Sequence, residues 1–383
     1  MKKYLLSLAV LMMGTAFLTS CDDNDSDPIP VPVVVSNGAY VICGGNESSN
    51  INGSLSYIDY NLGTASQNLF KAMNGRNLGL TPNDAVIYGE KMYIAVSGEN
   101  TIEVVDAKTL KSLKQIKTTE LMGADKGVMP RHITAYAGCI FVSTYGSSAA
   151  DWKSYTTSGN GYVAAIDTIN YSIANIFTAG SYPEGITIAN NKLYVANSDY
   201  SMGSKASISV IDLSTGTDTP IVDASIVNPT AVGVAGTDVF VLDMGNYYDI
   251  PSALHKYSGG KMTKLFEATH ASFMGTNIYA CNSVYGTIPT EFYVYDINTN
   301  NKTICSTGLN GRFFSPNVIA ADPVTGKIYI ASYNENSDYP GYANYSANGY
   351  VAEYSAQGTL LKTYDCGVGP NAIVFNTGIE YVK

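Results

Sequence analysis

The chain repeats one pattern at a nearly fixed interval, and this repeat limits the choice of fold more than any other feature. A proline is followed eleven positions later by an aromatic residue in an apolar run, as in PEGITIANNKLYVAN, which begins at Pro183. A period of this kind indicates a repeat architecture. The mean period from the first proline to the last is 48 residues. The other copies begin at Pro82, Pro130, Pro229, Ala268, Pro316 and Pro370.

Each repeat predicts four short antiparallel strands. The first strand ends in a tight turn, such as Gly89-Glu90 or Asn190-Asn191, and the second is of the KLYVA type. After a variable loop, a third strand ends in an aspartate that can bond the backbone two residues on, and a fourth strand closes the unit. About seven such units predict an all-β fold, a single seven-bladed β-propeller over residues 37–383. The aspartates are Asp59, Asp106, Asp167, Asp212 and Asp296.

Two segments compete to complete the last unit, which begins at Pro370. Residues 38–70 contain three strand-like runs that could supply its outer strands, whereas residues 379–382 could return as its second strand. The sequence leaves this choice open. Either arrangement would bring the two ends of the chain together and remove exposed sheet edges.

The first residues predict export and lipidation. Residues 1–20 have the pattern of a lipoprotein signal peptide, with Lys2 and Lys3 before an apolar run that is too short to span a bilayer. The run ends in Leu-Thr-Ser-Cys, which resembles a lipobox, so we expect Cys21 to carry lipid. Residues 21–36 then form an acidic, proline-rich tether. The acidic cluster resembles the signal that exports lipoproteins of Bacteroidota to the cell exterior, so we expect an anchor in the outer membrane.

Composition excludes some classes of partner. Loss of the two leader lysines changes the formal net charge from −10 to about −12, which argues against nucleic acid and against charge-driven binding to anionic lipid. Thirty tyrosines, thirty-six glycines and only 14% charged residues are typical of a turn-rich extracellular β protein.

Five cysteines remain after Cys21, and an odd number excludes complete pairing within the chain. None has CxxC spacing, so no zinc site is expected. A bridge between Cys281 and Cys305 would lie within one repeat, but the sequence leaves the disulfide state of all five open. They are Cys43, Cys139, Cys281, Cys305 and Cys366.

The variation between repeats is concentrated in the loops between the second and third strands. In a repeat protein such insertions indicate the face that binds. We expect these loops to share one face with the connections that lead into each next unit. Tyrosines and the only tryptophan gather in them: Tyr145, Trp152, Tyr155, Tyr200, Tyr247, Tyr248, Tyr285, Tyr333, Tyr339, Tyr342 and Tyr345.

The connections carry a second signal, because the chain's three arginines, Arg76, Arg131 and Arg312, all fall in them. His132 and His270 occupy equivalent repeat positions. We therefore expect aromatic loops and arginines to converge on one rim. Tyrosine and tryptophan suit a large ligand with flat apolar faces and hydrogen-bonding groups, and arginine suits a phosphate or carboxylate on it.

Signals for catalysis are few. The chain has three histidines and no GxSxG, HExxH or P-loop motif. The segment 334–338 is only weakly similar to a calcium loop, since it lacks the glycine and the terminal glutamate. We expect a protein that is not an enzyme and that uses no catalytic cofactor or metal.

Two family resemblances follow from these residues. The segment LYVANSDYSMGSKASISVIDLSTG, preceded by GSYPEGITIANN, resembles the YVTN repeat of surface-layer propellers. The combination of an acylated cysteine, an acidic tether and one such propeller with an aromatic face resembles the BtuG family, surface lipoproteins of gut Bacteroidota that capture cobalamin. The resemblance implies tight binding of cobalamin and related corrinoids and their transfer to a BtuB-like, TonB-dependent outer-membrane transporter.

A corrin ring is broad, flat and fringed with amides, and its nucleotide loop carries a phosphate, so it suits the expected face. We predict that five aromatic residues pack on the ligand and that Arg131 or Arg312 bonds its amides or phosphate. The full predicted set is Trp152, Tyr155, Tyr333, Tyr339, Tyr345, Arg131, Arg312, His132, Tyr247 and Tyr200.

Two alternatives from other classes remain. A glycan-binding or adhesive surface protein would use stacking tyrosines equally well. A propeller hydrolase or lactonase would need metal-binding carboxylates along the axis, for which Asp84 and Glu184 offer only scattered positions.

Overall fold

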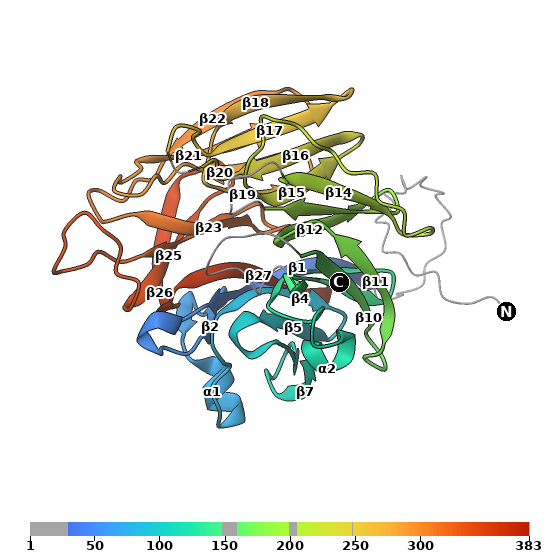
Figure 1. Ribbon diagram of the computed structural model, residues 1–383. Coiled ribbons are helices and arrows are strands. Elements are labelled where there is room, and N and C mark those ends of the chain that lie inside the picture. Colours follow the sequence, from blue (N-terminus) through green and yellow to red (C-terminus); the bar gives the residue numbers. More distant parts are fainter. Residues whose placement is uncertain (1–29, 148–158, 199–204, 247, 383) are drawn as a thin grey trace, which may run out of the picture. The chain divides into compact units, whose positions relative to one another are not determined.

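The computed structural model describes residues 30–147, 159–198, 205–246 and 248–382. Residues 34–378 form one compact unit, and the few described residues outside it, 30–33 and 379–382, are extended. The unit consists of seven antiparallel sheets, which we call blades 1 to 7 (Figure 1). Six blades have four strands, and blade 3 has three among the described residues.

The first strand of each blade begins within two positions of the residue that the repeat predicts. The first strands of consecutive blades are neighbours in space: β4 contacts β8, β8 contacts β12, and β12 contacts β15. Blades 1 to 7 begin with β4 (Pro82–Tyr88), β8 (Pro130–Tyr136), β12 (Pro183–Ala189), β15 (Pro229–Ala235), β19 (His270–Met274), β23 (Ser315–Ala321) and β27 (Pro370–Val382).

The second strands pair with the first through tight turns whose residues have positive φ, as at Gly89, Asn190 and Asn191. Glycine and asparagine tolerate this region, which antiparallel two-residue turns require. The second strands of blades 1 to 6 are β5 (Lys91–Val96), β9 (Cys139–Thr144), β13 (Lys192–Asn197), β16 (Asp238–Asp243), β20 (Asn277–Cys281) and β24 (Ile328–Tyr333).

The third strands confirm the predicted role of the aspartates. In blade 1 the Asp106 carboxylate accepts the backbone N–H groups of Lys108 and Thr109, at 3.1 and 2.7 Å. The other four predicted aspartates accept backbone N–H groups two and three residues on in the same way. The third strands of blades 1 to 6 are β6 (Thr101–Asp106), β10 (Gly161–Asp167), β14 (Ser207–Asp212), β17 (Ala253–Ser258), β21 (Glu291–Asp296) and β25 (Asn348–Tyr354).

The outermost strands are β7 (Ser112–Lys117), β11 (Ile173–Ala179), β18 (Lys261–Glu267), β22 (Asn301–Ser306) and β26 (Leu360–Val368). In blade 3 the predicted fourth strand is reduced to isolated bridges, from Ile208 to Ile221 and from Ile211 to Asp218. Pro220 interrupts this segment and has no N–H for a ladder. Short helices α1 (Leu69–Asn74), α2 (Thr118–Met122), η1 (Glu47–Ser49) and η2 (Ser97–Glu99) lie in connections.

The strand order of blade 7 shows which segment closes the propeller. The order is β27-β1-β2-β3, so β1 (Val31–Cys43), β2 (Ser54–Asp59) and β3 (Thr64–Ser66) supply the outer strands. Residues 379–382 continue β27 and do not return as a second strand. The ring is closed by side-chain bonds on both sides of β27: Asn317 donates to the Pro370 carbonyl at 2.8 Å, and Asn371 donates to the Pro82 carbonyl at 3.1 Å.

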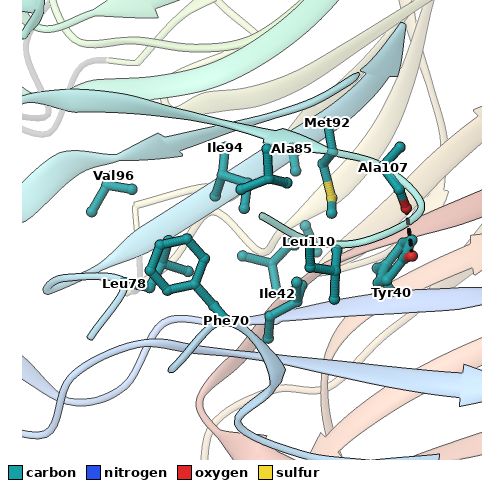
Figure 2. Close-up of a cluster of buried hydrophobic side chains, with 13 residues drawn as sticks. Tyr40, Ile42, Phe70, Leu78, Ala85, Met92, Ile94, Val96, Ala107 and Leu110 are labelled. Atoms are coloured by element: carbon teal, nitrogen blue, oxygen red, sulfur yellow. Dashed lines mark hydrogen bonds between the residues drawn. The ribbon is translucent and has the colours of Figure 1, made fainter. Parts of the chain in front are cut away.

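The core is divided among the interfaces between consecutive blades. Seven clusters of buried apolar side chains each lie between two neighbours, including blades 7 and 1. Figure 2 shows that last interface, where Ile42 of blade 7 lies near Leu110 of blade 1 and the Tyr40 hydroxyl donates to the Ala107 carbonyl at 2.7 Å. A continuous set of such interfaces makes this unit a seven-bladed β-propeller.

All five described cysteines are free thiols. Cys305 pairs with Phe292 on β21, and β21 separates it from Cys281 on β20. Two strand spacings amount to about 10 Å, which is beyond the Cα separation of about 7 Å that a disulfide can bridge. The bridge within one repeat is therefore not formed. Cys43 and Cys366 both belong to the buried cluster between blades 7 and 6.

Candidate functional site

A cavity of about 910 Å³ opens on the loop-rich face of blades 4, 5 and 6. Its walls come from the loops between second and third strands, as the sequence predicts, and from the connections into β19 and β23. These elements meet because each blade sends both kinds of segment to the same end. The lining includes Met244, Tyr248, Asp249, Ile250, Glu267, His270, Asn282, Val284, Tyr285, Phe313, Asn317, Tyr333, Tyr342 and Tyr345.

Tyrosines form the main walls of this cavity. The Tyr285 and Tyr342 ring centroids are 5.4 Å apart, and Tyr333 meets Tyr345 edge-on at 4.9 Å. Tyr285 is 76% exposed, and Tyr342 and Tyr345 are nearly half exposed. Large aromatic surfaces in such a concave place are available to a ligand. Tyr333 lies deeper, and burial raises its pKa to about 12, so it remains a neutral hydroxyl.

Polar groups in the cavity include an unsatisfied amide. The Asn282 side-chain oxygen is buried and has no partner within the described part of the chain. A buried acceptor of this kind costs free energy until a donor reaches it. His270 contacts the Thr269 hydroxyl at 3.0 Å, and burial lowers its pKa to about 4. The imidazole is therefore neutral at physiological pH and adds no positive charge.

The formal charges along the cavity are negative. Asp249 and Glu267 contribute carboxylates, and the described lining residues include no lysine or arginine. A ligand with its own phosphate or carboxylate would meet repulsion here, whereas amides and hydroxyls would meet acceptors.

The structure brings together some of the predicted contact residues. Tyr333 and Tyr345 both line the cavity. Tyr339 belongs to the same loop and is 69% exposed, but it is not part of the lining. Trp152, Tyr155, Tyr200 and Tyr247 lie outside the described residues.

Arg131 and His132 lie in a different place, on β8 of blade 2. The Arg131 guanidinium binds both oxygens of Glu184 on β12, at 3.0 and 3.2 Å. His132 lies between Asp84 of β4 and Glu184, with nitrogen–oxygen distances of 3.2 and 3.5 Å. The Tyr145 hydroxyl also donates to Glu184. We call Asp84, Arg131, His132, Tyr145 and Glu184 the charged cluster; it joins the inner strands of blades 1 to 3.

Charge strongly affects titration within the charged cluster. Burial disfavours ionisation of Glu184, but the Arg131 and His132 charges hold its pKa well below the usual range. Burial also opposes protonation of His132, yet hydrogen bonds and charge from Asp84 and Glu184 raise its pKa to about 9. Glu184 and His132 are thus both ionised at neutral pH.

The other two arginines are also held by protein partners. Arg312 stacks on the Tyr350 ring, with its guanidinium carbon 3.6 Å from the centroid, and donates to Thr363 at 3.2 Å. Arg76 donates to the buried Glu103 carboxylate at 2.8 Å, on the third strand of blade 1. The three arginines therefore serve three separate groups of contacts and do not meet on one rim.

Sequence reasoning omitted several lining residues from its contact set. Tyr285 and Tyr342 stood among the loop tyrosines, and His270 stood at a marked repeat position, so their signals were present. No sequence pattern indicated Asn282 or Glu267, because their place in the cavity depends on burial and on loops from other blades.

The weakly calcium-like loop is engaged with itself. The Glu335 carboxylate accepts the Gly341 N–H at 2.7 Å, and the Asn336 side chain accepts the Asp338 N–H at 2.9 Å. Among the described residues, no group of three or more acidic, histidine or cysteine side chains is placed to hold a metal ion. Nor does any described helix have the length and apolar character needed to cross a membrane.

Comparison with known proteins supports the fold. A hypothetical selenium-binding protein of Sulfolobus tokodaii superposes with a TM-score of 0.65 at 13% identity, covering 89% of this chain and 93% of its own. A proposed 6-phosphogluconolactonase of Bacteroides uniformis gives 0.56 at 12%, covering 89% and 100%. The Cps50 (Swd1) β-propeller domain of Myceliophteria thermophila gives 0.50 at 10%, covering 79% and 96%.

At these identities the likeness shows the fold alone. No protein-family model matches the chain, and no curated protein matches its sequence. The resemblance to the BtuG family therefore remains a prediction from sequence.

Proposed function

We propose that this protein captures a corrinoid, such as cobalamin, in the tyrosine-lined cavity of blades 4 to 6. The observation that carries the proposal is the cavity itself. Its volume of about 910 Å³ falls in the range of small-molecule sites. Exposed rings of Tyr285, Tyr342 and Tyr345 offer flat contact surfaces, and the buried Asn282 side-chain oxygen has no partner among the residues that the structure describes.

The charge of the cavity favours the amide-rich part of a corrinoid. Side-chain amides of the ligand can donate to Asp249, Glu267 and Asn282, whereas a phosphate would be repelled. Because Arg131 and Arg312 are engaged elsewhere, the phosphate of the nucleotide loop would face solvent in this arrangement. This differs from the sequence prediction, in which Arg131 or Arg312 bonds the amides or phosphate of the ligand.

The proposed cellular role rests on the predicted leader. A lipid on Cys21 would hold the propeller at the outer membrane, where the captured ligand would pass to a TonB-dependent, BtuB-like transporter. These residues lie outside the described part of the chain. Labelling with a lipid precursor and surface proteolysis of intact cells would test the placement.

The first experiment is calorimetric titration of the purified full chain with cyanocobalamin. We expect tight one-to-one binding, and Tyr342→Ala should weaken it at least tenfold because a central aromatic contact is lost. Tyr136→Ala is the matched control, since Tyr136 is 40% exposed at the end of β8 that is remote from the loop-rich face. No heat at micromolar protein would contradict the proposal.

Ligand chemistry provides a second test. A corrinoid whose peripheral amides are replaced by carboxylates should bind at least tenfold more weakly than the amide form, because Asp249 and Glu267 repel anions. Equal affinity for the two forms would argue against binding in this cavity.

A glycan is the second candidate ligand. Exposed tyrosines beside two carboxylates can stack on sugar faces and accept sugar hydroxyls. A hit on a glycan array, without corrinoid binding, would favour this function. A lactonase activity has less support, because Asp84 and Glu184 contact His132; hydrolysis of lactones that is lost on metal stripping would favour it.

A further inference from the structure

A second hollow of about 310 Å³ shares two lining residues with the main cavity. Tyr333 and Tyr345 line both spaces, so this edge-on pair forms a shared wall. A hydrogen bond continues the connection, since Asn317 of the main cavity donates to the Asn371 side chain of the second hollow at 3.0 Å. The two spaces are therefore adjoining compartments of one face.

Apart from the two tyrosines, the second hollow is built by residues 44–47, which follow β1, by Thr81 before β4, and by Asn371 in β27. It depends on glycine, because a Cβ on Gly44 would lie 2.3 Å from the Asn371 amide nitrogen. Asn46 fixes the shared wall from this side, as its amide donates to the Tyr345 carbonyl at 2.9 Å. The hollow is thus held in register with the tyrosines of the main cavity.

One carboxylate dominates the chemistry of this hollow. Glu47 is exposed and accepts a bond from Thr81 at 3.4 Å. A carboxylate has about four acceptor positions, so acceptor capacity remains. The described residues around the hollow include no lysine or arginine. The hollow is therefore suited to a neutral group that donates hydrogen bonds, and it disfavours a phosphate.

We propose that the second hollow is a subsite for a neutral arm, a primary amide or hydroxyl, of the ligand whose body fills the main cavity. This inference rests on the proposed corrinoid binding. Peripheral amide arms radiate from the edge of a corrin ring, so a ring packed against Tyr345 can extend one arm past it. The arm donates to Glu47, while the tyrosine pair contacts the ring.

The test is a charge reversal at Glu47, read with two ligands. Glu47→Lys should weaken binding of the amide corrinoid about tenfold and strengthen binding of its carboxylate analogue about tenfold, so the preference for amide over acid should fall about a hundredfold. Glu47→Gln should have a smaller effect on both. Glu120→Lys is the matched control, because Glu120 is an exposed acid in α2 outside both spaces.

The outcomes separate the two proposals. If the unmodified protein binds no corrinoid, both the function and the subsite are wrong. If it binds tightly but Glu47→Lys leaves the amide-to-acid preference as in Glu120→Lys, only the subsite is wrong. Thermal unfolding of each variant verifies that the change lies in binding and not in folding.

Discussion

The charged cluster of blades 1 to 3 and the tyrosine cavity of blades 4 to 6 use opposite chemistry. In the cluster, Arg131, His132 and Glu184 are ionised, largely enclosed and bonded to one another. In the cavity, Tyr285, Tyr342 and Tyr345 are exposed and contact mainly other rings. In the charged cluster, rare charged residues hold blades together, whereas tyrosine, the most common aromatic residue, forms the candidate site.

The difference has a physical origin. A buried charge is costly unless it is paired, so charges near the inner strands are retained only with partners. An exposed aromatic ring has no such requirement and keeps its surface for a ligand. In this molecule, whether a side chain is already bonded to a protein partner is therefore a better guide to function than how rare its residue type is.

The largest expected effect is the loss of Glu184. Glu184→Ala should lower the free energy of unfolding by about 3–5 kcal/mol, because it leaves Arg131 and His132 partly buried without their shared carboxylate. Urea denaturation measures this, with Glu120→Ala as the control. A loss below about 1 kcal/mol would show that the cluster is not structural and would break the comparison.

The next effect concerns the cavity. Tyr342→Ala combined with Tyr345→Ala should weaken cyanocobalamin binding by roughly 30- to 100-fold while leaving the urea midpoint nearly unchanged, since both side chains are about half exposed. Calorimetry and denaturation of the same sample give both values. A large loss of stability with intact affinity would assign these tyrosines to the core.

A smaller effect is expected from pH. The raised pKa of His132 means that its contribution is complete below pH 6.5 and is lost as pH rises through about 9. The lowered pKa of Glu184 gives a contribution that is present above pH 4.5 and is lost on acidification. Unfolding free energy should therefore fall between pH 6.5 and 9.

His132→Gln should reduce this alkaline decline, and urea midpoints at the two pH values provide the measurement. Ligand affinity should change less than stability over the same range, because the cavity histidine, His270, is already neutral. An alkaline decline of the same size in His132→Gln would place its origin elsewhere.

The smallest effect is predicted for Tyr339. Although this tyrosine is 69% exposed in a cavity loop, it does not line the cavity, so Tyr339→Ala should change affinity by less than about twofold. Calorimetric titration of both Tyr339→Ala and Tyr342→Ala with cyanocobalamin tests whether the binding site ends at the cavity lining. An effect as large as that of Tyr342→Ala would extend the site along the loop.

Sequence periodicity was sufficient to predict the propeller, because strand starts, tight turns and aspartate turns are local features. It could not choose the closing strand, since β1 and residues 379–382 fit equally well by spacing. It also predicted a fourth strand in blade 3, where only bridges form beside Pro220.

The site was predictable only at the level of its face. The loops between second and third strands of blades 4 to 6 line one cavity, and two tyrosines of the predicted contact set, Tyr333 and Tyr345, are among its lining. The pairing of Arg131 with Glu184, 53 positions away, depends on the contact between β8 and β12, which no local pattern reveals.

Closure by β1 has a consequence for biosynthesis. The Gly44 N–H donates to the Gly369 carbonyl, so the first and last blade segments join residues more than 300 positions apart. Such non-local pairing forms slowly. During vectorial synthesis the propeller cannot close, and the backbone groups at the edge of β1 that pair with β27 lack their partner, until the final strand is synthesised. The last fifteen residues therefore decide whether any copy of the chain completes its fold, and a truncation there should yield protein that is prone to aggregate.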